Sequence, residues 1–148
     1  MIVIVLIYRS PLKKGRNIYG IIFGASHPRA VDKFLKTAWD KNNQNGEANF
    51  DIEDDSNKQQ LDLFEGQLPT KIEIFQNHLK DLILSKKITT NKDAYDYTLE
   101  HGHLDKHANE IIKQMKKEGL VHYDTNSPMA NYEQVYKNKK IIEYSLTP

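Results

Sequence analysis

Three histidines stand close together in the sequence, at a spacing that metal sites use. His103 and His107 are four residues apart, so on a helix both rings would lie on one face, with His101 just before them. A zinc site of this kind adds a thiolate or a helix carboxylate, and the chain contains no cysteine. We therefore predict no metal site, but a turn followed by the start of a helix, with His107 packing or touching a phosphate.

A run of acidic residues near the middle of the chain is a second candidate for metal binding. Carboxylate oxygens are ligands for calcium and magnesium, but these acids lack the glycine and glutamate spacing of an EF-hand loop. A solvated loop explains them better, and we expect Phe50 and Ile52 to be buried within it. The acidic residues are Glu47, Asp51, Glu53, Asp54 and Asp55.

Lysines form the third group, and they suit contacts with nucleic acid. A lysine binds a phosphate as a point charge, and an asparagine can read adenine. The candidate nucleic-acid-binding residues are Lys106, His107, Asn109, Lys113, Lys116, Lys117, Lys137, Lys139 and Lys140. An ordinary charged outer face of a helix explains much of this set equally well. Residues 71–148 contain no arginine, so any binding should be weakly specific.

The sequence carries no motif for catalysis or for a cofactor. It has no G-x-S-x-G turn for a nucleophilic serine. It also has no G-x-G-x-G turn to hold a nucleotide cofactor, and no acidic residue placed to take its ribose. We therefore predict a chain that is not an enzyme, with no catalytic residues and no cofactor.

Composition and charge agree with a globular protein of one domain or two small ones. The chain has 148 residues, of which 39% are hydrophobic and 28% charged, and its mean hydropathy is −0.68. The longest apolar run, Met1–Ile7, is too short to cross a membrane, and the absence of cysteine fits the cytoplasm. The net charge is +6 over residues 1–46, −6 over residues 47–70 and +1 over residues 71–148.

The elements that must position these side chains suggest an α+β fold in three parts. Residues 1–41 predict a hydrophobic hairpin-helix unit, with strands at Met1–Tyr8 and Ile18–Phe23 joined by the loop RSPLKKGRN. A helix should follow over residues 28–41, with Ser26 as its N-cap and Pro28 in its first turn. Residues 42–70 predict an acidic connector, with one short helix near its end.

Residues 71–148 have the element order of a winged helix-turn-helix. Apolar spacing predicts a helix from Thr70, a second that Thr90 or Asn91 caps, and a third from about residue 105 to Gly119. Gly102 suits a left-handed helix end between the second and third helices. Strands at 120–123 and 141–146 would form the wing, and the third helix would be the recognition helix.

Four stretches of the chain together resemble the three-Cys-motif partner (TcmP) family. They are LIYRS (6–10), YGIIFGASHPRAVDKFLKTAW (19–39), GEANFDI (46–52) and TLEHGHLDKHANEIIKQMKKEGLV (98–121). The last stretch resembles the GMT-like winged helix-turn-helix with which such proteins end. In that family a Rossmann-type, methyltransferase-like domain comes first, and the resemblance here begins at what would be its last hairpin.

The resemblance and the residues together suggest a binding module without catalysis, the C-terminal part of a TcmP-like protein that binds duplex DNA weakly and with little specificity. The alternative is an assembly element, because one helix cannot cover both apolar faces of the N-terminal hairpin. Its residues 1–23 would then pair with a second copy, making a homo-oligomer, or with a missing methyltransferase-like domain. No membrane partner is expected.

Overall fold

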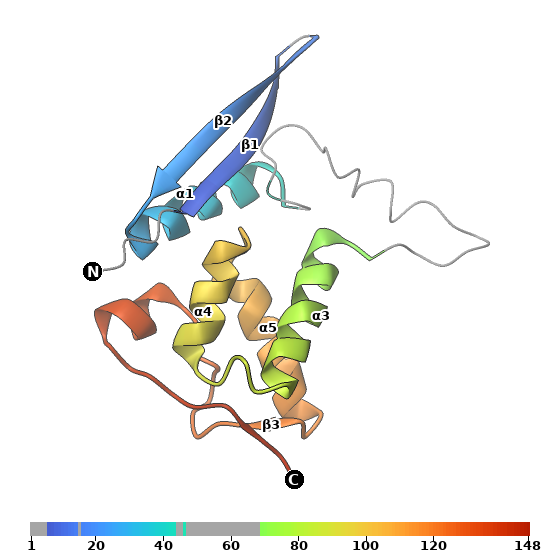
Figure 1. The fold of residues 1–148 in the computed structure, drawn as a ribbon, viewed down its shortest axis with the longest axis vertical. Helices are drawn as coiled ribbons and strands as arrows, with labels where there is room; N and C mark the ends of the chain where they lie inside the picture. Colours follow the sequence, from blue (N-terminus) through green and yellow to red (C-terminus); the bar gives the residue numbers. More distant parts are fainter. Residues whose placement is uncertain (1–5, 15, 44–45, 47–68) are drawn as a thin grey trace, which may run out of the picture. The chain divides into compact units, whose positions relative to one another are not determined.

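The computed structural model describes residues 6–14, 16–43, 46 and 69–148 (Figure 1). They fall into two compact units, Met1–Ile74 and Phe75–Pro148, which we call the hairpin-helix unit and the winged-helix unit. The first part of the predicted Met1–Tyr8 strand, most of the acidic connector and the pair Phe50 and Ile52 lie outside the described residues. No helix in the described ranges is long and apolar enough to span a membrane.

The hairpin-helix unit begins with two antiparallel strands, β1 (Leu6–Lys14) and β2 (Asn17–Ala25). The predicted hairpin is confirmed, but the predicted RSPLKKGRN loop is wrong. Lys14 pairs directly with Asn17, so only two residues link the strands and Pro11 lies within β1. A proline is tolerated there because a strand of a two-stranded sheet always has one outer edge, where a backbone N–H is not needed.

Helix α1 (Pro28–Lys41) follows the hairpin and confirms the predicted bounds. Its N-cap is His27 and not Ser26, because His27 has the extended backbone of a cap and its Nδ1 accepts a hydrogen bond from the Arg29 N–H at 3.3 Å. Phe34 stacks on Phe23 of β2, with ring centroids 4.1 Å apart. This stack fixes the helix against its own hairpin.

The winged-helix unit contains the helices α3 (Lys71–Leu84), α4 (Asn91–Glu100) and α5 (Asp105–Lys117), and the first part of α3 lies before the boundary of the units. Two of them begin with reciprocal caps. The Thr70 hydroxyl accepts from the Glu73 N–H while the Glu73 carboxylate accepts from the Thr70 N–H, and Thr90 and Asp93 repeat the arrangement in α4. Thr90, and not Asn91, is therefore the cap of α4.

Glycines end the second and third helices as predicted. Gly102 and Gly119 both have φ of +71°, a left-handed conformation that a residue with a Cβ adopts only at a cost. The chain then turns so that the His103 N–H donates to the Thr98 carbonyl and the Leu120 N–H to the Met115 carbonyl. These turns set the start of α5 and the start of the following strand.

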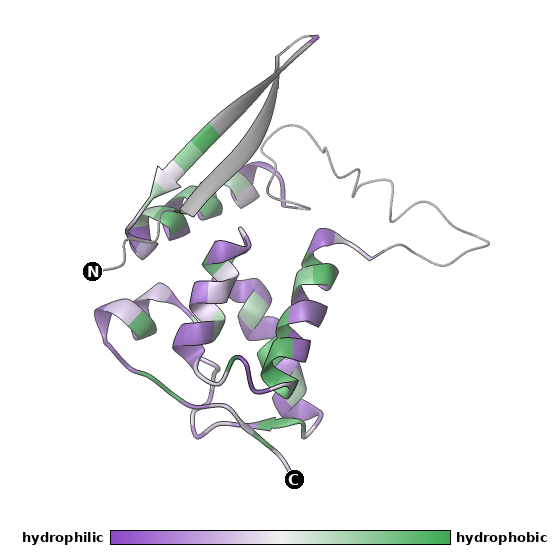
Figure 2. Ribbon diagram, in the orientation of Figure 1, coloured by the Kyte–Doolittle hydropathy of each residue, from purple (hydrophilic) through white to green (hydrophobic). Residues whose placement is uncertain are grey.

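The core of the winged-helix unit lies between its three helices and the last third of the chain. Bands of hydrophobic and hydrophilic residues alternate along α3 in Figure 2, as expected for a helix with one buried face. Its most completely buried hydrophobic side chains come from all three helices, from the strand after them and from the chain beyond it: Leu79, Ile83, Ala94, Tyr95, Ala108, Ile112, Met115, Val121 and Ala130. The observed architecture is the predicted α+β winged helix.

A small antiparallel sheet closes the unit. Strand β3 (Val121–His122) pairs with β4 (Ser145–Leu146), and Glu143 forms a further bridge to Thr90. Both wing strands are shorter than the predicted 120–123 and 141–146, and a long stretch of chain separates them. It is an excursion over residues 123–144 that contains the short helix η1 (Glu133–Lys137) and buries Ala130, Val135 and Tyr144.

Candidate nucleic-acid interface

Helix α5 presents one apolar face to the core and one basic face to solvent. Its buried side chains are His107, Ala108, Ile111, Ile112 and Met115. Opposite them lie Lys106, Lys113 and Lys117, all exposed, which we call the lysine face. Their spacing of seven and then four residues places the three ammonium groups on one stripe along the helix.

The cations of the lysine face and the acids near them differ in their contacts with the other described residues. Within the described part of the chain, none of its three ammonium groups is in an ion pair or a side-chain hydrogen bond. Glu118 accepts from Gln114 at 2.7 Å and from Lys80 at 3.1 Å, and these bonds hold the pKa of its carboxyl below the usual value. Glu110 is the one exposed acid on the stripe itself, and it lies 3.5 Å from the Gln76 amide.

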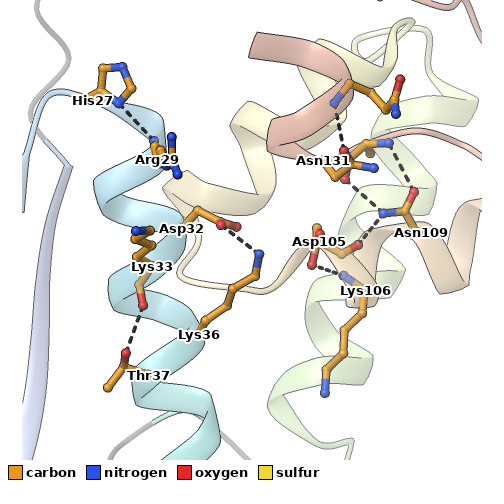
Figure 3. A network of polar contacts seen from close by, with 12 residues as sticks. His27, Arg29, Asp32, Lys33, Lys36, Thr37, Asp105, Lys106, Asn109 and Asn131 are labelled. Carbon is orange, nitrogen blue, oxygen red and sulfur yellow. Dashed lines mark hydrogen bonds and ion pairs between the residues drawn. The ribbon is translucent and has the colours of Figure 1, made fainter. Parts of the chain in front are cut away.

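Asn109, a predicted base-reading residue, is held by its own fold (Figure 3). Its amide nitrogen donates to the Asp105 carbonyl at 2.8 Å and to the Ala130 carbonyl at 3.0 Å. Its amide oxygen accepts from the Ala130 N–H at 3.2 Å. Since reading an adenine would need this same amide, Asn109 serves here to fasten the excursion to α5.

Lys116 lies on the same flank of α5 and is engaged in a similar way. Its ammonium group donates to the carbonyls of Tyr123 and Thr125 at 2.7 and 3.1 Å. The same group lies 4.0 Å from the centre of the Tyr123 ring, a cation–π contact. Lys116 therefore ties the end of α5 to the chain after β3, and it is separate from the lysine face.

His107 is part of the core. Its ring is 2% exposed, its Nδ1 accepts from the Leu104 N–H at 3.4 Å, and the Nδ1 of His103 is 3.3 Å away. Burial, with a smaller effect of the Lys106 charge, lowers the pKa of His107 to about 4. His103 in turn stacks on Phe75, with centroids 4.1 Å apart. The predicted packing role of His107 fits this position, and its ring has almost no surface to offer a phosphate.

The described ranges contain no group of three or more side chains that could hold a metal ion. The contact between the rings of His103 and His107 serves the junction of α4 and α5.

The remaining predicted lysines lie on the excursion. Lys137 pairs with Glu133 within η1 at 2.6 Å, while Lys139 and Lys140 are exposed. Lys139 has φ of +52°, which marks a sharp turn directly after η1.

Asn91 fixes the turn at Lys139, although sequence reasoning considered it only as a cap. It is completely buried and donates to the carbonyls of Met129 and Lys140 at 3.0 and 2.9 Å. Its amide oxygen accepts from the Ile142 N–H at 2.9 Å. One side chain thus closes both ends of the segment that carries the two exposed lysines.

The fold defines the class of this unit, a winged helix-turn-helix whose third helix, α5, carries the exposed lysine face. A model of the GMT-like wHTH domain family matches residues 49–128, more than half of the chain, so the chain belongs to that family. Winged helix-turn-helix domains generally bind nucleic acid and are typically not catalytic. No curated protein matches the chain, and no solved structure does.

Proposed function

We propose that the winged-helix unit binds duplex DNA through the lysine face of α5, as the C-terminal module of a TcmP-like protein with no catalysis of its own. The observation that carries the proposal is the set of three exposed ammonium groups opposite the buried face of the helix, none of which forms an ion pair with another described residue. Each such group can neutralise a phosphate and release a counterion. Lys139 and Lys140, on the turn that Asn91 holds, supply a second contact.

Binding is weakly specific in this proposal, because the unit has few side chains that read bases. It contains no arginine, and the Asn109 amide is occupied by the backbone at Asp105 and Ala130. Phosphate contacts fix position and orientation on a duplex without carrying sequence information. The affinity should therefore depend on salt much more than on sequence.

The test is a salt titration of duplex binding by the whole chain. Replacing Lys106, Lys113 and Lys117 together by Ala should lower the slope of log K against log salt by about 0.9 for each phosphate that the variant no longer neutralises. The matched control is the pair Lys86 and Lys87, exposed lysines on the turn after α3, whose replacement by Ala should leave the slope nearly unchanged. Equal binding by the triple variant and the parent at low salt would overturn the proposal.

A further inference from the structure

The register of the N-terminal hairpin leaves its two outer edges unequal. Lys14 pairs with Asn17 across two adjacent residues, and the nine pairs run without a bulge to Leu6 and Ala25. In an antiparallel ladder, pairs that exchange two hydrogen bonds alternate with pairs that exchange none. The pair that closes a two-residue loop, here Lys14 and Asn17, exchanges two hydrogen bonds. Because the two kinds of pair alternate, this decides for every other pair of the ladder whether it is hydrogen-bonded.

In the pairs that exchange no hydrogen bonds, the backbone N–H and C=O groups of both residues point to the outer edges of the hairpin. Counting from the loop, these pairs contribute Lys13, Pro11, Arg9 and Ile7 on β1, and Ile18, Gly20, Ile22 and Gly24 on β2. Pro11 has no N–H, so the outer edge of β1 lacks a donor near its middle. The outer edge of β2 has every donor and every acceptor, and no described strand other than β1 pairs with β2.

The charges of the two strands also distinguish the two edges, and they too favour β2 as the strand that pairs. Strand β1 contains Arg9, Lys13 and Lys14, whereas β2 (NIYGIIFGA) contains no charged residue. Two copies of β1 side by side would bring positive charges together, and two copies of β2 would not. An uncharged edge with all its backbone groups present is the more suitable one for adding a strand.

We propose that a second copy of this chain adds its β2 antiparallel to this edge, about a two-fold axis at Ile21. In that register Ile18 lies opposite the partner's Gly24, and Gly20 lies opposite the partner's Ile22. Each glycine of the edge is thus opposite an isoleucine in the register. Ile22, which is 72% exposed in one copy, lies next to the two-fold axis in this register.

The same register also lets the backbone form new hydrogen bonds between the two copies. Each of the outward residues joins a pair that exchanges two hydrogen bonds, and the product is a four-stranded sheet of order β1, β2, β2, β1. A two-stranded sheet is marginal by itself in water, whereas three or more strands can be stable. The dimer therefore completes the element that the hairpin-helix unit leaves open.

The experiment is sedimentation of the full chain over a range of micromolar concentrations. We expect twice the mass of the 17.2 kDa chain, falling to one chain on dilution. Ile22→Lys should raise the dissociation constant of the dimer at least about tenfold, because the two new charges lie close to the axis. The matched control is Ile74→Lys, the same change at another exposed isoleucine, and it should leave the constant unchanged.

Amide hydrogen exchange of the unmodified chain provides the second measurement, in case Ile22→Lys disturbs the hairpin itself. The N–H groups of Ile18, Gly20, Ile22 and Gly24 should be protected at high concentration and lose that protection on dilution. A monomer throughout the concentration range would overturn the proposal. So would a dimer that Ile22→Lys leaves intact, or protection of these amides that persists in the monomer.

Discussion

Among the described residues, the two units of this chain differ in how their backbone groups are paired. In the winged-helix unit, the amides of Asn91 and Asn109 both form hydrogen bonds with main-chain groups of the excursion. In the hairpin-helix unit, one strand edge keeps its full row of donors and acceptors with no described strand beside it. The first pattern is that of a closed module that offers a side-chain surface, and the second is that of an element that pairs through its main chain.

The largest expected effect concerns Asn91, which holds the winged-helix unit closed. Asn91→Ala leaves two carbonyls and one N–H without their partner in a completely buried place, which should cost about 3 kcal/mol of unfolding free energy. Urea unfolding followed by circular dichroism measures the change. Trp39, the one tryptophan of the chain, belongs to the other unit, and the transition seen in its fluorescence should move little.

The matched control for Asn91 is Asn138→Ala, a change at an exposed asparagine of the same unit, which should cost less than about 0.5 kcal/mol. If the two variants are equally stable, the hydrogen bonds of Asn91 do not hold the excursion. The closed character of the winged-helix unit would then need another explanation.

A second effect comes from His107 and depends on pH. Its pKa is about 4 in the folded chain and near 6.5 unfolded, so the unfolded state binds the proton first as the pH falls. Stability from this group is therefore complete above pH 6.5 and is lost as the pH falls towards 4, by roughly 2–3 kcal/mol in all. Unfolding of the winged-helix unit at several pH values should show this loss.

His107→Gln should flatten the pH dependence between pH 6.5 and 4.5, relative to the parent. The control is His78→Gln, which changes an exposed histidine of α3 and should leave the pH dependence as it is. An unchanged slope in the His107 variant would show that burial of this ring is not the source of the pH dependence.

The smallest effect is a difference between two glycines, one in each unit. Gly46 and Gly119 have φ of +72° and +71°, so alanine should bring a similar backbone strain at both, about 1 kcal/mol. A Cβ at Gly46 would also lie 2.7 Å from the Trp39 ring, whereas a Cβ at Gly119 meets nothing within 4 Å. Gly46→Ala should therefore cost about 1–3 kcal/mol more, visible in the fluorescence of Trp39. Equal costs would mean that the ring moves aside freely.

Local signals in the sequence account for most of the helix boundaries. The caps at Thr90 and the glycines at 102 and 119 act within one turn of the helix that they begin or end, so sequence alone predicts them. The amphipathic patterns of α1 and α5 are equally local, and their bounds were predicted closely. The order of the helices and strands predicted in this way indicated a winged helix.

The sequence could not predict two kinds of feature. Some depend on contacts between residues far apart in the chain, and others depend on a choice between two plausible local structures. Asn91 bonds to residues 38, 49 and 51 positions away, and no local pattern announces such partners. The helix η1 and the fastening of Asn109 depend on the same excursion. The extension of β1 through Pro11 was missed because proline usually signals a loop, and His27 was missed because Ser26 beside it is the more common cap.

The most direct test of the account is a titration of the isotope-labelled full chain with a short duplex, followed by amide NMR spectra. Binding by the closed module predicts that the shifts concentrate at the lysine face of α5, with a smaller set at Lys139 and Lys140. The amides of β2 should not respond to the duplex, because in the proposed dimer that edge pairs with a second copy. Shifts centred on β2, or no shifts on α5 at low salt, would contradict the division of roles between the two units.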